Sequence, residues 1–469
     1  MYHGFTLSNP PKRKTSGDYS QMTATQKVLR TLIVSACALF AATAFAQLQD
    51  DQIALSGSLL ENGSTGKFTK LAAHAHLPNG QAHARHGVPN IDSILNWNDH
   101  YFAPGYLDNG TTDGIFNNHW YINQIGNPPN NYGTTHFNAP VVPVDIDLRN
   151  FDGSIRYVTD ANGNFVLDKN GNKIRMYLEA SPHLPYVLGS PVFQNSTYSS
   201  SSTPTQFTDA VQRAQFFSKA KDDWHTILDP SVKTKRVMTL NRGTYRFALN
   251  PDNTVRYVLV DANTFVNELF PPTATDTATV IGQAEHAGDI TTKDISSFIF
   301  PNTFLYTGDP NVPGNCCILG FHTYDFEPGD DSNGNVEKRY VVNYSSWISP
   351  GLFGAAFIDI TAHSHEIAET FNDPFVVSDG VRNLTPWWKS PNGNCQNDLE
   401  DGDVVEGLSN ATYPVTLPVN GTAFTFHPQN EALLQWFQEG PSDAIGHAYS
   451  YPNTSVLTSP NQVQKPNCK

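Results

Sequence analysis

The sequence is short of basic residues. It contains 29 lysines and arginines against 44 aspartates and glutamates, so its formal net charge is −15 at pH 7. A chain of this charge lacks the positive surface that attracts nucleic acid or an anionic membrane. We therefore expect no nucleic acid among its partners. The acidity fits solubility or the binding of cations instead.

Long apolar runs are also scarce. The segment 27–46 has a basic start, an apolar run at 32–40 and a small-residue end, a pattern typical of a secretory signal peptide. The apolar run is shorter than the ~20 residues that span a bilayer. We predict that residues 1–46 are a signal peptide, with Met22 as an alternative natural start. The protein would then be secreted or periplasmic, with no stable membrane insertion after cleavage before Gln47.

Cysteine is rare, with five residues in the chain. Cys37 lies in the predicted signal peptide, and an even number of cysteines in an exported protein favours disulfides. Adjacent cysteines seldom pair with each other, because disulfides favour Cα atoms about 4.4 to 6.8 Å apart. We therefore expect Cys316 and Cys317 to pair with Cys395 and Cys468, in an order that the sequence leaves open.

Turn-forming and apolar residues are plentiful. The chain has 33 glycines, 32 prolines and 39% hydrophobic residues, which indicates a folded protein rich in strands and loops. The apolar segments 140–146 and 245–249 predict strands, whereas 204–225 has apolar residues at helical spacing. These patterns predict an α+β fold with a strand-rich N-terminal region.

The segment 363–374 reads His-Ser-His-Glu-Ile-Ala-Glu-Thr-Phe-Asn-Asp-Pro. We expect it on a helix over about residues 354–372. A helix advances about 100° per residue, so His365 and Glu369 lie on one face and can bind one metal ion. Glu366 points about a quarter turn away, where a catalytic general base would stand. Carboxylate ligands make this site harder than one with two histidines, and Zn2+ is the expected ion.

A hydrolytic metal site needs a third protein ligand. Asp373 lies eight residues after His365, about 12 Å away in a continuous helix, so we assign it to the helix end. The acidic segment 398–403 is a better source if it returns to the helix. There we prefer Asp403, with Glu400 next.

Other histidines leave alternatives open. His427 and His447 are outside candidates for the third ligand. His363 lies about 200° round the helix from His365, so we expect it to be structural. The alternative to a metal site is a helix end with a polar pair at i, i+4, followed by a solvated acidic turn.

The motif at 365–374, followed by Glu400-Asp-Gly-Asp403, resembles a known pattern. This is His-Glu-[Ile/Leu]-Ala-Glu-x-x-x-[Asp/Asn]-Pro with a later Glu-x-[Gly/Ala]-Asp. It is found in uncharacterised secreted bacterial proteins and in plant phosphate-induced, exordium-like proteins. The resemblance covers about residues 340–410. It implies a zincin-like metal helix in an exported protein, with the site on His365, Glu366, Glu369, Glu400 and Asp403.

These observations together predict four segments. They are a signal peptide (1–46), a loop-like leader or pro-segment (47–110), a strand-rich region (111–300) and a zincin-like metal-site domain (301–469). The predicted function is a secreted zinc-dependent hydrolase, with a metallopeptidase acting on an extracellular peptide or protein as the first choice. The alternative is a non-catalytic extracellular or cell-surface protein with a structural or vestigial metal site.

Overall fold

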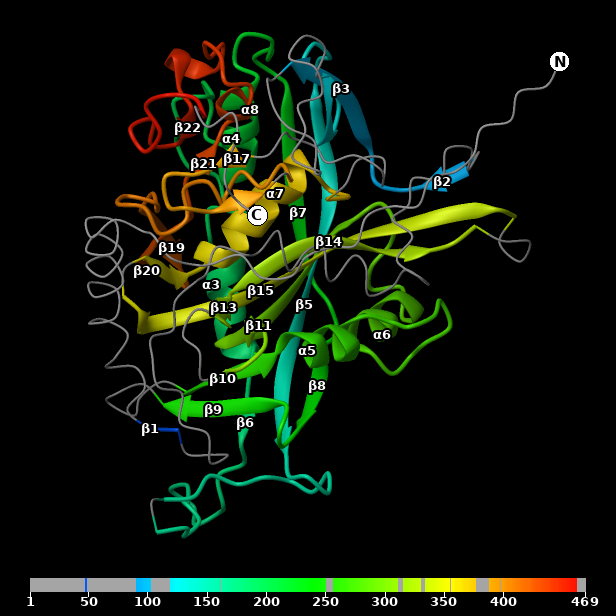
Figure 1. Ribbon diagram of the computed structural model, residues 1–469, viewed down its shortest axis with the longest axis vertical. Helices are drawn as coiled ribbons and strands as arrows, with labels where there is room; N and C mark the ends of the chain where they lie inside the picture. Colours follow the sequence, from blue (N-terminus) through cyan, green and yellow to red (C-terminus); the bar gives the residue numbers. More distant parts are fainter. Residues whose placement is uncertain are drawn as a thin grey trace, which may run out of the picture.

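A computed structural model of the protein (Figure 1) describes residues 47–48, 90–102, 119–160, 162–249, 256–310, 315–329, 334–354, 356–376, 388–396 and 398–461. The predicted signal peptide, most of the predicted leader, Cys37 and Cys468 lie outside these residues. The described part contains both helices and many strands, so the predicted α+β class is confirmed. No described helix is long and apolar enough to cross a bilayer.

A nine-stranded mixed sheet forms the centre of the molecule. Its main path is β14 (Gly320–Glu327), β15 (Val336–Phe353), β11 (Ile295–Pro301), β5 (Thr134–Arg149) and β6 (Tyr177–Leu178). Four further strands pair with this path: β2 (Asn90–Asp92) and β16 (Phe357–Asp359) with β15, and β7 (His225–Val232) and β8 (Arg236–Asn241) with β5. Strands β5, β11 and β15 are parallel, whereas β14 runs antiparallel to β15. The sheet therefore takes strands from both sides of residue 300, where we placed a domain boundary.

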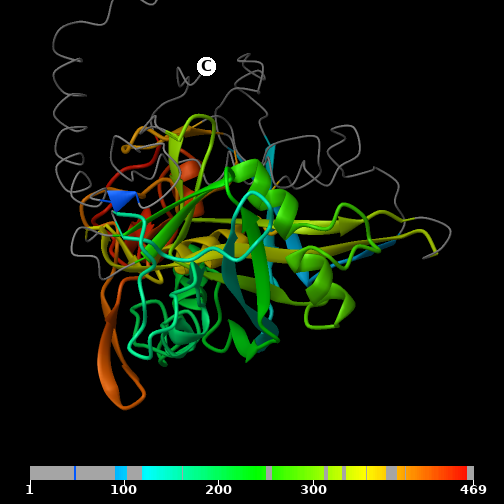
Figure 2. The same cartoon turned by 90° about the horizontal axis from the view of Figure 1, so that it is seen from below.

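The other strands form smaller sheets. A five-stranded sheet contains β1 (Gln47–Leu48), β9 (Tyr245–Leu249), β10 (Arg256–Asp261), β12 (Thr303–Tyr306) and β13 (Cys316–Ile318). Four two-stranded pairs are β3 (Asn96–Phe102) with β4 (His119–Ile125), β17 (Trp388–Lys389) with β18 (Cys395–Gln396), β19 (Val415–Val419) with β20 (Thr422–Phe426), and β21 (Glu431–Ala432) with β22 (Ser450–Tyr451). Figure 2 shows the β19–β20 hairpin, in orange, extending away from the rest of the protein.

The helices are short. They are α3 (Leu184–Leu188), α4 (Phe207–Gln215), α5 (Ala262–Leu269), α6 (Val280–His286), α7 (Thr361–Asn372) and α8 (Leu434–Phe437), with 3-10 turns η2 (Ser181–His183) and η4 (Ile445–His447). The strands predicted at 140–146 and 245–249 are confirmed as parts of β5 and β9. The helix predicted over 204–225 is wrong in its length. It ends at Gln215, and Phe216 turns inward against Trp224.

Side chains alternate between the two faces of the central strands, and this alternation explains why helices pack on both faces of the sheet. On β5, Val142, Val144, Ile146 and Leu148 enter one core, with α5 and α6, whereas Phe137, Ala139 and Val141 enter a second core, with α3 and α7. Residues of opposite parity lie on opposite faces of a strand, so the sheet has a helical layer on each face. Helix α7 belongs to the second layer (Figure 1).

The predicted start of the motif helix is wrong. We expected the helix from residue 354, but it begins at Thr361, and Phe357–Asp359 form strand β16 against β15. Asp359 has a positive φ of 49°, which breaks the helical path just before α7. Its carboxylate instead accepts a hydrogen bond from the backbone N–H of His427 (3.1 Å). A short apolar run is compatible with either a strand or a helix. Pairing with β15 makes this one a strand.

The predicted disulfide pairing is also wrong. Cys316 and Cys317 are joined to each other on β13. The peptide bond between them is cis and their Cα atoms lie 3.0 Å apart, outside the range of ordinary disulfides on which the prediction rested. Cys395 is also disulfide-bonded. Its bond therefore does not involve Cys316 or Cys317.

Candidate metal centre

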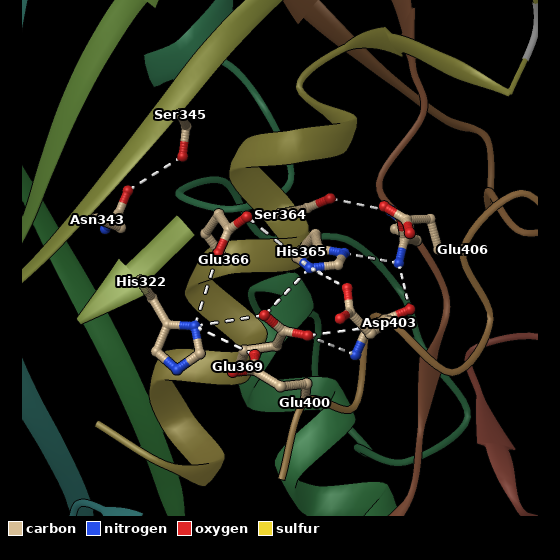
Figure 3. Close-up of polar contacts among 12 residues, drawn as sticks. His322, Asn343, Ser345, Ser364, His365, Glu366, Glu369, Glu400, Asp403 and Glu406 are labelled. Atoms are coloured by element: carbon tan, nitrogen blue, oxygen red, sulfur yellow. Dashed lines mark hydrogen bonds and ion pairs between the residues drawn. The ribbon is translucent and has the colours of Figure 1, made fainter. Parts of the chain in front are cut away.

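Helix α7 carries the His-Glu-x-x-Glu motif onto one face of the nine-stranded sheet. Ile367 and Phe371 pack in the core against the strands. The remaining motif side chains, His365, Glu366 and Glu369, point toward β14 and toward the segment 398–406 (Figure 3). All three are at most 2% exposed, so the motif lies inside the protein.

The first predicted ligand set comes together. Glu369 Oε2 lies 3.1 Å from His365 Nε2, and Asp403 Oδ1 lies 3.6 Å from the same nitrogen. These three residues form a buried group whose donor atoms could hold a metal ion. The backbone N–H groups of Gly402 and Asp403 donate to Glu369 Oε1, at 3.1 and 3.2 Å, and attach the acidic segment to the helix.

Gly402 permits this close approach. A Cβ atom at this position would lie 2.5 Å from His365 Nδ1, nearer than side chains allow. Gln429 holds the same side of the ring: its Nε2 lies 2.9 Å from His365 Nδ1 and donates to Gly402 O at 2.8 Å. The outer nitrogen of His365 is thus anchored, while Nε2 faces the carboxylates.

Strand β14 contributes a histidine that the sequence analysis missed. His322 is fully buried, and its Nδ1 lies 3.3 Å from Glu369 Oε2, 3.6 Å from Glu366 Oε2 and 3.6 Å from Glu400 Oε2. It belongs to the two other groups that could hold an ion, one with Asp373 and Glu400 and one with Glu366 and Glu369. The available signal was one histidine in the strand Gly320–Glu327, which also contains Thr323 and Asp325, and a histidine alone does not indicate a ligand.

The other predicted ligands divide between the two histidines. Asp373 follows the last turn of α7, as expected, but its Oδ1 lies 2.6 Å from His322 Nε2. The distance along the helix argued only against Asp373 and His365 binding the same ion. It did not predict a contact between Asp373 and His322. Glu400, the second choice for the third ligand, lies beside His322, whereas Asp403 lies beside His365.

The remaining candidate histidines bond elsewhere. His427 Nδ1 lies 2.7 Å from Asp359 Oδ2, and His447 Nδ1 donates to Ser442 O at 2.8 Å. His363 Nε2 lies 3.1 Å from Ser297 Oγ, in keeping with a structural role. None of the three belongs to a group that could hold an ion within the described part of the chain.

The electrostatics of the centre are unbalanced. Both carboxylate oxygens of Glu366, Glu400 and Glu431 are buried without a hydrogen bond among the described residues. Burial raises the pKa of Glu400 and of Glu431 well above the usual range, with Glu369 and Asp401 adding to the respective shifts. Burial also raises the pKa of Glu366 to about 7, although His365 and His322 act in the opposite direction. For Glu369, the two histidines outweigh burial and lower the pKa.

This arrangement fits a divalent cation. A buried carboxylate without a partner costs several kcal/mol, and a bound cation removes that cost. Imidazole nitrogens and carboxylate oxygens are suitable ligands for such ions. Metal-binding histidines commonly have their outer nitrogen held by a carboxylate or another polar group, as Asp373 holds His322 and Gln429 contacts His365.

The centre thus contains buried histidine, glutamate and aspartate groups that could hold a metal ion, contributed by β14, α7 and the segment 398–403. The sequence motif supplied His365, Glu366 and Glu369, and the fold adds His322. Comparison of the chain with protein-family models, with curated proteins and with solved structures finds no significant match in any of the three.

Proposed function

We propose that the protein is an exported metal-dependent hydrolase that uses zinc and acts on peptides or proteins. The observation that carries the proposal is the convergence of His365 Nε2, Glu369 Oε2 and Asp403 Oδ1 beside the carboxyl group of Glu366. That carboxyl group makes no hydrogen bond among the described residues. One nitrogen and two carboxylate oxygens form an acceptable ligand set for zinc in an open site. Export rests on the signal-peptide pattern of residues 1–46.

Each residue then has a separate task. Zinc, when bound, would supply a Lewis acid and make a neighbouring water more acidic. His365, Glu369 and Asp403 hold the ion, and the Gly402 and Asp403 N–H groups hold Glu369 in place. Glu366 accepts a proton from water, because it is next to His365 in the helix and its oxygens make no hydrogen bond among the described residues.

A structural metal site in a non-catalytic extracellular protein is the second candidate. The observation that favours it is burial: His365 is 2% exposed, and Glu369 and Asp403 are 0% exposed. Structural zinc sites are usually closed by protein ligands, whereas catalytic sites keep an open position. The two candidates therefore share the ion and differ in whether water and substrate reach it.

Metal analysis and activity assays on purified protein separate the candidates. We expect stoichiometric zinc in the wild type and in Glu366→Gln, and a loss of hydrolysis by about 10²-fold or more in this variant, because a positioned general base contributes that much. Glu268→Gln, at an exposed carboxyl group on α5, serves as the control. Peptide and ester panels provide the substrates.

Three results would contradict parts of the proposal. Protein without stoichiometric metal would remove both candidates. Unchanged hydrolysis in Glu366→Gln would remove the assigned base. Bound metal without hydrolysis on any substrate of the panels would favour the structural role.

A further inference from the structure

The two histidines of the centre face the same pair of carboxylates, His322 from strand β14 and His365 from helix α7. Glu369 Oε2 lies 3.1 Å from His365 Nε2 and 3.3 Å from His322 Nδ1. Glu366 also faces both rings: its Oε1 lies 3.8 Å from His365 Nε2, and its Oε2 lies 3.6 Å from His322 Nδ1. Figure 3 shows Glu369 between the two imidazoles.

Each histidine also has an outer carboxylate of its own. Asp403 lies 3.6 Å from His365, and Glu400 lies 3.6 Å from His322. In the described part of the chain, every group that could hold an ion contains one of the two histidines and never both. The donors therefore lie in a His365–Asp403 half and a His322–Glu400 half, and the group of His322 and Glu400 is completed by Asp373. Glu369 connects the halves through its Oε2, which lies close to both histidines.

An ion in the first half does not account for the second. His322 Nδ1 and both oxygens of Glu400 are buried, with no hydrogen bond among the described residues. These atoms point toward one another from β14 and from the acidic segment. An unpartnered buried carboxylate is costly, and an ion held by His365 and Asp403 leaves Glu400 without a ligand role.

A protonated His322 is an insufficient counterion. It would supply one positive charge, and its Nε2–H already donates to Asp373. Its Nδ1 would then face Glu366, Glu369 and Glu400 together. A divalent cation brings more charge and several coordination positions, so it satisfies these oxygens better than one N–H group can.

We propose that a second divalent cation binds His322 Nδ1, Glu400 and Glu369, so that Glu369 joins two ion positions in one centre. The inference rests on the metal centre of the proposed function but does not require hydrolysis. Asp373 is a positioning residue in this site, because it holds Nε2 of His322 and leaves Nδ1 as the ligand atom.

Zinc stoichiometry of the full chain tests the second site. Purified protein is freed of metal, exposed to Zn2+ alone and analysed for bound zinc per chain by mass spectrometry and calorimetry. We expect two equivalents for the wild type and one for Glu400→Gln, which removes a charge at nearly constant volume. His322→Gln provides an independent variant with the same expected loss, in case Glu400→Gln fails to fold.

Glu431→Gln is the matched control. It also removes a fully buried carboxyl group without a hydrogen bond among the described residues, but Glu431 belongs to none of the groups that could hold an ion. It should retain two equivalents. Loading with Mn2+ adds a spectroscopic test: two ions joined by one carboxylate should give a magnetically coupled electron paramagnetic resonance signal, which Glu400→Gln should convert to that of an isolated ion.

The outcomes separate this inference from the proposed function. One equivalent in the wild type, or two retained in both Glu400→Gln and His322→Gln, overturns the second site and leaves the hydrolase proposal standing. No bound zinc overturns both. Two equivalents without hydrolysis support the second site and contradict the hydrolase.

Discussion

At the scale of single residues, Gly402 shows how closely the acidic segment approaches the motif helix. A Cβ atom there would lie 2.5 Å from His365 Nδ1. We therefore expect Gly402→Ala to displace the imidazole, to lower zinc affinity and to cost about 1–3 kcal/mol of unfolding free energy, as overpacking generally does. Urea denaturation and zinc titration measure the two effects.

Gly440→Ala is the control for this prediction. Its nearest neighbour to a new Cβ is a backbone oxygen 3.8 Å away, so an added methyl group fits without displacement. Zinc affinity in Gly402→Ala equal to that of Gly440→Ala would show that the contact does not constrain His365.

Glu285 on α6 gives a pH-dependent prediction away from the metal centre. Burial raises the pKa of Glu285 to about 10, with the negative charges of Asp325 and Glu327 adding to the shift and Lys338 opposing it. The folded chain therefore retains a proton that the unfolded chain releases near pH 4.5, so the free energy of unfolding falls as pH rises between these values. Glu285→Gln should remove this part of the pH dependence.

The measurement is urea denaturation at pH 5 and pH 9. Relative to wild type, Glu285→Gln should gain more stability at pH 9 than at pH 5. Glu179→Gln, at an exposed carboxyl group, should show no such difference. An equal change at both pH values in Glu285→Gln would contradict the prediction.

At the scale of elements, the packing of α7 on the sheet determines where the proposed metal ligands lie. Ile367 is fully buried between the helix and the strands. Ile367→Ala should cost about 2–5 kcal/mol of unfolding free energy, because it removes buried methyl groups and leaves a cavity. It should also weaken zinc binding, since His365 and Glu369 lie on the same helix. Chemical denaturation and zinc titration provide the two values.

Val237→Ala is a suitable comparison, because Val237 on β8 is 40% exposed. Its effect on stability should be small. If Ile367→Ala lost stability but bound zinc as tightly as Val237→Ala, helix packing would not be what places the ligands.

The sequence predicted local features of the site better than distant ones. Helical spacing correctly predicted that His365 and Glu369 share a face, because that relation depends only on residues within one turn. It could not find His322, which lies 51 residues before its partner Asp373 and meets it only because β14 pairs with β15. The start of α7 was wrong for a similar reason, since pairing with β15 makes residues 357–359 a strand.

For the acidic segment, the sequence predicted the neighbourhood of the motif but not the individual contacts. Its charge pattern led to Asp403 and Glu400, and both lie beside the motif, yet beside different histidines. The charge pattern indicates cation binding. Which histidine each carboxylate lies beside depends on the register of β14 in the sheet, which the charge pattern does not reveal. The cysteine prediction failed because it used the geometry of ordinary disulfides for a pair of adjacent residues.

At the scale of the whole molecule, the buried carboxyl groups should make stability depend on metal. Ions that bind the folded chain raise its stability by about 2.7 kcal/mol at a free concentration of 100 times Kd. We expect the melting temperature to rise with zinc, to fall in a chelator and to recover when zinc is added back. Calorimetric scans at pH 7 test this expectation. A melting temperature unaffected by chelator, in protein shown to contain zinc, would contradict it.

The donors of the centre come from segments far apart in the chain. His322 lies on β14, His365 on α7 and Asp403 in the acidic segment. His322 and Asp403 are about 80 residues apart, and closing such a loop in an unfolded chain carries an entropic penalty. The candidate site therefore forms only once strand, helix and segment have docked, and the proposed ions would bind there only late in folding. Metal uptake would then mark the completion of folding, and the rate of uptake would follow the slowest docking step.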